Sequence, residues 1–178
     1  MAGALGPLGS ARASIVEAID FDTLVQEADD VVLARVIKQW TLYDQHGRIV
    51  TDFQMQVERV EKGTSAPGSA IVVRKLGGII GDRGMRIAGE PDFTIGEEVL
   101  VFGIRGKNTF LRPVGMGQGT MRIFEQDGAR WARSDAEGMM LVKPGDTNTK
   151  GRAAMPAPRL LDDVLADVHE LVAAQRVP

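Results

Sequence analysis

The chain has 178 residues, the length of one domain or of one domain with an appendage. It carries 21 Lys and Arg against 24 Asp and Glu, a formal net charge of −3, and 44% of it is hydrophobic. This balance is typical of a globular protein and argues against a disordered chain. The chain has no cysteine and 2 histidines, which excludes disulfides, thiolate metal sites and cysteine nucleophiles. No apolar run approaches the ~20 residues of a membrane-spanning helix.

Acidic and basic residues are interleaved along almost the whole chain. The richest basic stretch, residues 83–86, is flanked by Asp82 and Glu90. Because nucleic-acid binders usually present a basic face, the sequence predicts that nucleic acid is not the partner.

Residues 1–13 are small and rich in Gly and Pro, so we expect no regular element there. Residues 11–13 (ARA) have the small-x-small form of a signal-peptidase site. Residues 6–10 (GPLGS) also fit the remnant of a cleaved fusion tag, and a flexible native terminus is the third alternative. We expect a signal-peptide remnant or tag, and a secreted or periplasmic bacterial protein that begins at Ser14 when mature.

A short helix comes next in the chain. Phe21, Leu24, Val25 and Ala28 fall on one helical stripe. Asp20 or Asp22 can cap its start, and Asp29 and Asp30 end it.

A long β region runs from residue 31 to about residue 142. Its clearest strand, residues 48–58, alternates apolar and polar side chains. The alternation changes at Val60, which indicates a bulge or the end of the strand near Arg59. Residues 31–37 and 99–104 are apolar on both faces and are predicted as central strands. Further strands are predicted at residues 70–76, 110–114, 120–124, 129–132 and 139–142. Short strands at this spacing favour a closed or partly closed antiparallel barrel over a βαβ sheet. We therefore expect a mainly β domain over residues 14–142 that includes the N-terminal helix.

Residues 143–157 have the composition of a linker. Beyond them, residues 158–178 are predicted to form an amphipathic helix that packs on the barrel, because large apolar residues repeat at helical spacing. These residues are Leu160, Leu161, Val164, Leu165, Val168, Leu171 and Val172. Docking of this helix on a partner chain is the alternative.

The glycine-rich motifs and the acids do not form a catalytic pattern. Residues 115–119 (GMGQG) open a strand rather than a helix, so a close backbone approach or a bulge is expected there instead of a dinucleotide site. Residues 77–81 (GGIIG) lack the ending of a phosphate loop. His46 lies in a turn beside Asp44, where an exposed histidine is the simplest interpretation. Glu97 and Glu98 are adjacent, so they point apart. The sequence predicts no enzyme, no cofactor and no metal.

The order of the strand patterns carries a family resemblance. It lies in residues 28–36 (ADDVVLARV), 53–63 (FQMQVERVEKG), 70–78 (AIVVRKLGG) and 96–102 (GEEVLVF). This succession resembles a group of exported bacterial proteins of unassigned function. It is also similar in order to the netrin-like domain of the tissue inhibitors of metalloproteinases, an OB-type five-stranded barrel flanked by helices. The resemblance covers about residues 14–124 and implies a netrin-like fold.

In those inhibitors the free N-terminal amine and the first carbonyl chelate the zinc of the protease. Ser14 would take that place here if cleavage follows Ala13, although the family's first residue is a disulfide-anchored cysteine and this chain has none. We therefore expect a non-enzymatic module that binds a protein partner, with modulation of a metalloprotease as its most specific form. The expected partner-binding residues are Ser14, Ile15, Trp40 and Tyr43. An OB-type module that binds a carbohydrate or an oligonucleotide is the alternative.

Overall fold

The computed structural model describes residues 14–106, 110–136, 139–145 and 152–175. The prediction of a signal-peptide remnant or tag at residues 1–13 lies outside this part of the chain, and so does the middle of the predicted linker.

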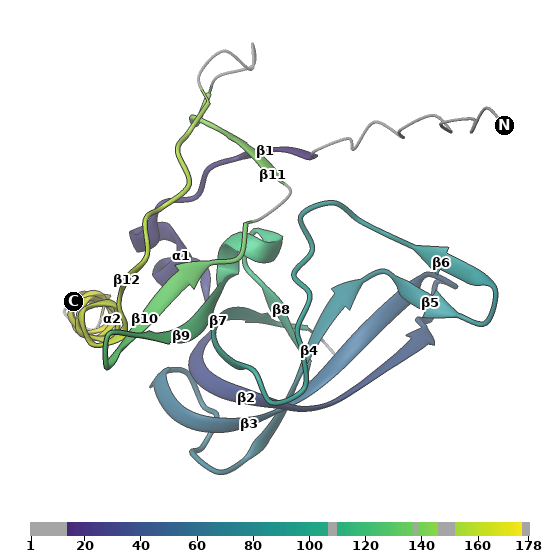
Figure 1. The fold of residues 1–178 in the computed structure, drawn as a ribbon, viewed down its shortest axis with the longest axis horizontal. Coiled ribbons are helices and arrows are strands. Elements are labelled where there is room, and N and C mark those ends of the chain that lie inside the picture. The colour runs from purple at the N-terminus through teal and green to yellow at the C-terminus, as the bar shows by residue number, and fades with distance from the viewer. Residues whose placement is uncertain (1–13, 107–109, 137–138, 146–151, 176–178) are drawn as a thin grey trace, which may run out of the picture.

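The described chain is mainly β, with one short helix near its start and one longer helix at its end (Figure 1). The helices are α1 (Phe21–Glu27) and α2 (Leu161–Gln175), and a 3₁₀ turn, η1, spans Met116–Gly119. The strands are β1 (Ser14–Glu17), β2 (Asp30–Tyr43), β3 (Ile49–Lys62), β4 (Ala70–Leu76), β5 (Gly78–Ile80), β6 (Arg83–Met85), β7 (Glu98–Arg105), β8 (Leu111–Pro113), β9 (Thr120–Gln126), β10 (Ala129–Ser134), β11 (Met139–Val142) and β12 (Arg159–Leu160).

Eight strands form one sheet in the order β12-β10-β9-β7-β2-β3-β4-β8. Because β8 also pairs with β7, the strands β7, β2, β3, β4 and β8 make a partial ring. The β4–β8 pairing is parallel, so the sheet is mixed. The sequence had instead predicted a purely antiparallel arrangement. The hairpin of β5 and β6 projects from the ring, and β1 pairs with β11 in a separate two-stranded sheet above it (Figure 1).

Two hydrophobic cores lie on opposite faces of β2 and β7. Val32 of β2 and Val101 of β7 belong to the core inside the ring, with Phe53 from β3. Leu33 and Leu100 point the other way, into a core shared with both helices. These two strands are therefore buried on both faces, which confirms their prediction as central strands. Ile37 is the exception, with 42% of its surface exposed at the point where β2 leaves the core.

The register of β2 and β3 confirms the predicted bulge. Leu33 is opposite Arg59 and Ala34 is opposite Val57, so Glu58 is the extra residue. An extra residue changes which side chains face the core, and this accounts for the altered alternation at Val60.

Both predicted helices are present. Asp20 caps α1, and its carboxylate accepts a hydrogen bond of 2.7 Å from the Thr23 amide. On α2 the side chains of Val164, Leu165 and Val168 are buried in the core beside α1. Leu160 does not belong to the helix: it lies in β12, paired with Trp131, and is 37% exposed.

Two short motifs, Asp29-Asp30 before and at the start of β2 and Lys62-Gly63 at the end of β3, hold the ring together at one end. The Asp30 carboxylate, fully buried, accepts hydrogen bonds from Ser65 Oγ at 2.9 Å and Arg105 Nη2 at 2.7 Å. Gly63 fits against it so closely that a Cβ there would lie 2.4 Å from Asp30 Oδ1. These residues therefore have a structural role, joining the start of β2 to the β3–β4 turn and to β7.

Candidate functional site

A groove of about 290 Å³ lies at one rim of the ring. Its walls come from the β2–β3 loop, from β4, from the ends of the β7–β8 loop and from β8. The residues that line it are Asp44, Gln45, His46, Arg48, Val50, Arg74, Lys75, Leu76, Gly106, Phe110 and Arg112. We call this site the rim groove. It combines several cations with one aromatic ring.

The β2–β3 loop is organised by the Asp44 carboxylate. Asp44 Oδ1 accepts hydrogen bonds of 2.9 Å from the amides of His46 and Arg48, and Oδ2 accepts one of 2.8 Å from Arg48 Nε. Burial raises the pKa of Asp44, but these hydrogen bonds outweigh it and lower the pKa to about 2. The His46 side chain is exposed at the tip, as expected, and Asp44 contacts its backbone rather than its ring. The loop therefore presents Arg48 and His46 on a fixed turn.

Arg74 forms the floor of the groove and is held from two sides. Its Nε and Nη2 donate to the two oxygens of Asp52 at 2.6 and 2.7 Å, and its guanidinium carbon lies 4.1 Å from the centre of the Phe110 ring. The hydrogen bonds and charge of Asp52 raise the pKa of Arg74 although burial opposes them. Arg74 and Phe110 thus form a rigid flat surface.

Two further cations border this surface. Lys75 Nζ lies 2.7 Å from Asp92 Oδ1. Arg112 of β8 is exposed, and within the described residues it has neither an ion pair nor a side-chain hydrogen bond. Among the described residues, Arg112 is therefore the cation of this groove that lacks an ion pair, although its charge acts on the Glu90 carboxylate.

The four predicted partner-binding residues lie elsewhere and do not share one surface. Ser14 and Ile15 are in β1, which pairs with β11, while Trp40 and Tyr43 are in the ladder of β2 and β3. Ile15 is 57% and Tyr43 is 45% exposed, and Trp40 is half-buried beneath Lys38. None of the four lines the rim groove.

The glycine motif at residues 115–119 is a packing feature, as expected. A Cβ on Gly117 or Gly119 would lie 2.3 Å from a backbone oxygen, that of Asp135 or Val114 respectively. Gln118 between them is buried and accepts a hydrogen bond of 2.9 Å from the Ile19 amide. The motif joins η1 to the segment before α1.

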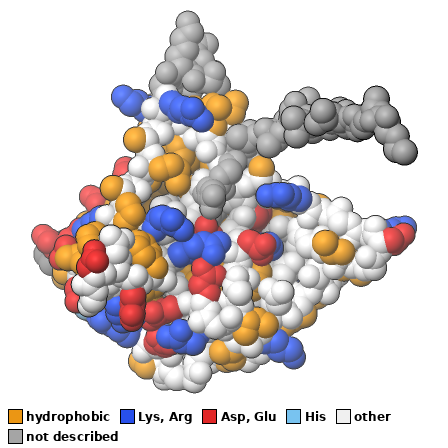
Figure 2. Space-filling view, in the orientation of Figure 1, with side chains coloured by type: hydrophobic (Ala, Val, Ile, Leu, Met, Phe, Trp, Pro, Cys, Tyr) orange, Lys and Arg blue, Asp and Glu red, His pale blue; other side chains and the backbone are white. Residues whose placement is uncertain are grey.

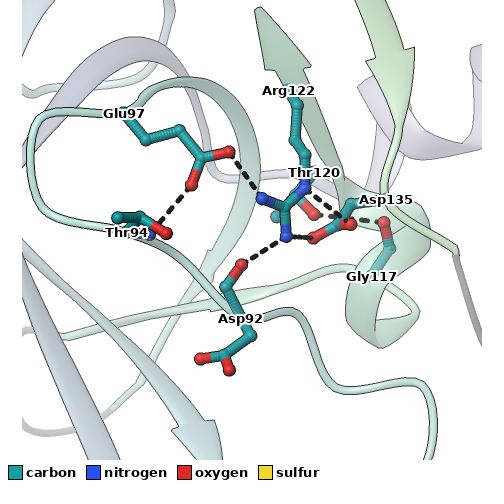
Figure 3. A network of polar contacts seen from close by, with 7 residues as sticks. All are labelled: Asp92, Thr94, Glu97, Gly117, Thr120, Arg122 and Asp135. Atoms are coloured by element: carbon teal, nitrogen blue, oxygen red, sulfur yellow. Dashed lines mark hydrogen bonds and ion pairs between the residues drawn. The ribbon is translucent and has the colours of Figure 1, made fainter.

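Arg122 of β9 is the centre of a structural ion network, drawn in Figure 3. It lies 2.6 Å from Glu97 and 2.9 Å from Asp135, and it donates to the Asp92 carbonyl oxygen at 2.5 Å. Glu98 instead contacts Arg130, so the adjacent acids Glu97 and Glu98 do point apart. The network fixes the loop before β7 against β9.

Nothing in the sequence indicated a pair of carboxylates, Glu58 of β3 and Glu98 of β7, on the two strands that flank β2. Burial raises the pKa of Glu58, and the nearby Glu98 carboxylate raises it further, while Arg35 at 2.8 Å opposes both. Arg35 is opposite Glu98 in the register of β2 and β7, and the bulge places Glu58 beside them. Only the strand register could have revealed this pair.

Comparison with protein-family models and with curated proteins finds no match to this chain. Across the ranges that the structure describes, no three metal-binding side chains gather in one place. The same ranges contain no helix that is long and apolar enough to cross a membrane.

Proposed function

We propose that the protein is a non-enzymatic binding module with an OB-type ring, and that it holds an anionic oligomer in the rim groove. The single observation that supports this most is the convergence of Arg48, Arg74, Lys75 and Arg112 on one groove beside Phe110. A positively charged groove with an aromatic platform suits a chain of negative charges.

The order of the ring strands supports the OB-type assignment. Numbered along the chain as 1 to 5, the strands β2, β3, β4, β7 and β8 follow one another in the ring as 1-2-3-5-4. OB-type barrels bind ligands on the face of strands 2 and 3 and at the loops that join strands 1–2 and 4–5. The rim groove lies at the corresponding β2–β3 and β7–β8 loops and on β4.

The overall charge does not argue against this ligand. On the face seen in Figure 2, Lys and Arg side chains lie beside Asp and Glu side chains instead of forming one continuous patch. Recognition would therefore depend on short-range contacts in the groove. The prediction that nucleic acid is not the partner depended on the interleaving of acidic and basic residues along the chain, and that pattern does not describe a site assembled from distant segments.

Fluorescence anisotropy with two probes tests the proposal. One probe is a labelled single-stranded oligonucleotide of about 12 residues, within the site sizes of OB folds, and the other is a labelled oligogalacturonate. We expect saturable binding of at least one probe. Arg112→Ala should weaken that binding up to about fivefold, the contribution of one exposed ion pair.

The matched control is Arg133→Ala, because Arg133 is also exposed but lies on β10 outside the groove. If both variants lose the same affinity for the probe, the loss reflects the change in net charge and contradicts the proposal. Absence of binding of either probe would also contradict it. The probe that binds distinguishes a phosphate chain from an acidic carbohydrate.

A second candidate is the binding of a protein partner through β1, with a metalloprotease as the specific case. The observation that favours it is the ordered backbone of this segment: β1 pairs with β11 from Ser14 to Glu17, and the Ala18 amide donates to the Val142 carbonyl oxygen at 2.8 Å. Such pairing supplies part of the preorganisation that a disulfide gives the netrin-like inhibitors.

The test for this candidate compares protein that begins at Ser14 with protein that begins at Met1, as inhibitors of a metalloprotease from the same host. If the Ser14 amine chelates zinc, the form that begins at Ser14 should inhibit more strongly, because its free amine can occupy the open coordination position of a catalytic zinc. Equal inhibition, or none, would exclude this mechanism. The predicted secreted or periplasmic location stays a prediction.

A further inference from the structure

A second cavity lies on the opposite side of the sheet from the ring interior, between the sheet, both helices and the chain segment that precedes α2. Its volume is about 380 Å³, and it shares no lining residue with the rim groove. We call residues 152–158, which cover one side of it, the strap. Figure 2 shows hydrophobic side chains gathered along the strap and over α2.

The cavity wall is almost entirely apolar. Ile19, Phe21 and Leu24 come from the α1 region, Met121 from β9, Leu141 from β11 and Val164 from α2. A volume of several hundred Å³ with an apolar lining and few polar groups is characteristic of small-molecule sites. The remaining question is which polar group a ligand would carry.

Most polar atoms at this cavity are already satisfied. Gln118 accepts from the Ile19 amide at 2.9 Å and donates to the Glu17 carbonyl oxygen at 3.1 Å. The Asp20 carboxylate accepts from the Thr23 amide as the cap of α1. Gln118 therefore holds the wall in place, and the Asp20 carboxylate has no donor to offer an anionic ligand.

Arg159 and Ser134 are the polar side chains at this cavity that can still donate a hydrogen bond to a ligand. One Arg159 nitrogen, Nη2, lies 2.6 Å from Asp167, and the guanidinium is 5.5 Å from the centre of the Phe21 ring. Because a guanidinium has five N–H donors, several stay free at the cavity mouth. The Ser134 hydroxyl has no hydrogen-bond partner among the residues that the structure describes. A cation and a hydroxyl beside an apolar cavity suit a carboxylate head group.

The strap is joined to the rest of the molecule by few bonds. The Ala153 amide donates to the Leu141 carbonyl oxygen at 2.8 Å, and the next ordered pairing is that of β12. Residues 154–158 are exposed and make no hydrogen bond to the described part of the chain. Pro156 and Pro158 have no N–H to donate. The strap can therefore move aside for a ligand without loss of sheet structure.

From this geometry we propose that the cavity is a binding site for an amphipathic carboxylate, with its alkyl chain between the sheet and the strap and its head group at Arg159 and Ser134. This site is separate from the rim groove and does not depend on its function.

Isothermal titration calorimetry of the full chain with dodecanoate, dodecanol and dodecylamine tests the proposal. We expect dodecanoate to bind saturably, with a dissociation constant below about 1 mM for a ligand of this size. Dodecanol and dodecylamine should bind about two- to fivefold more weakly, because they lack the partly exposed ion pair with Arg159.

Two variants locate the site. Ser134→Leu places bulk in the cavity and should abolish binding, whereas Arg159→Gln should bring dodecanoate to the affinity of dodecanol. The matched control is Arg133→Gln, at a neighbouring cation on β10. It should change neither the affinity for dodecanoate nor the affinity for dodecanol. Thermal melts check that each variant is folded, and dodecanoate should raise the melting temperature of the wild type but not of Ser134→Leu.

No saturable binding of dodecanoate would overturn the proposal. Unchanged binding of dodecanoate to folded Ser134→Leu would show that the ligand binds outside this cavity. Equal affinities for the three head groups would show that Arg159 does not contact the head group.

Discussion

Arg74 lies with its guanidinium carbon 4.1 Å above the centre of the Phe110 ring. The two residues are brought together by the pairing of β4 with β8. Asp52 holds the opposite edge of the guanidinium with two hydrogen bonds. The flat surface at the floor of the rim groove is therefore a product of the ring and not of any local sequence motif.

Removing Asp52 should destabilise the protein measurably. The side chains of Arg74 and Asp52 are 19% and 5% exposed, so Asp52→Asn leaves a largely buried cation without its counter-charge. We expect a loss of about 2 kcal/mol, below the value for a fully buried pair. Urea denaturation measures it. Asp92→Asn, whose side chain is 80% exposed in its ion pair with Lys75, should cost less than about 1 kcal/mol. Equal effects would contradict the rigid floor.

Gly119→Ala should be strongly destabilising because no space exists for a side chain. A Cβ at this position would lie 2.3 Å from the Val114 carbonyl oxygen and 2.5 Å from its nitrogen. Backbone atoms cannot move aside cheaply, so we expect a loss of about 2 kcal/mol or more. Gly84→Ala is the control, since its nearest neighbour would be 3.7 Å away. A melting temperature unchanged in Gly119→Ala would refute the close approach.

The α2 helix should contribute directly to stability. Leu165 is 2% exposed in the core that α1 and α2 share, so Leu165→Ala should cost about 2–5 kcal/mol. Ala166→Ser on the exposed side of the same helix should change stability by less than about 0.5 kcal/mol. Chemical denaturation with an intrinsic fluorescence readout compares them. If Leu165→Ala has the same free energy of unfolding as the wild type, the helix does not pack on the sheet.

Glu90 should make stability depend on pH in the direction opposite to an ion-paired acid. Burial raises its pKa above 4.5, although a hydrogen bond from the Leu76 amide and the charges of Lys75 and Arg112 oppose this. The folded state then binds its proton at higher pH than the unfolded state, so this contribution to stability increases as pH falls through that interval.

Glu90→Gln should therefore be more stable than the wild type at pH 7, and the difference should disappear on acidification towards pH 4.5. Thermal melts over a pH series measure the difference. Glu125→Gln, an exposed position on β9, removes the same charge and should show no such trend. A difference that grows on acidification would have the wrong sign for a raised pKa.

Local patterns in the sequence predicted the elements whose formation depends on residues close to one another in the chain. The stripe of Leu24 and Val25 identified α1, and the altered alternation at Val60 identified the bulge in β3. Pairings between distant segments had no such signal. The parallel pairs β1–β11 and β4–β8 join residues that are far apart in the chain, and period-2 patterns carry no information about partners.

The rim groove could not be predicted for the same reason. Arg74, Phe110 and Arg112 each fit an ordinary exposed or strand position when taken alone, and only closure of the ring places them together. The aromatic residues Trp40 and Tyr43, near the end of a predicted strand, were easier to notice, but the fold places them outside the groove.

The most direct test of the central claim is a map of backbone amide shifts by NMR while the protein is titrated with the probe that binds in the anisotropy assay. The account predicts saturable shifts concentrated at residues 44–48, 74–75 and 110–112, which line the groove. Arg112→Ala should reduce them at equal probe concentration, while Arg133→Ala should not. Shifts confined to β1 or α2, or shifts that do not saturate, would contradict it.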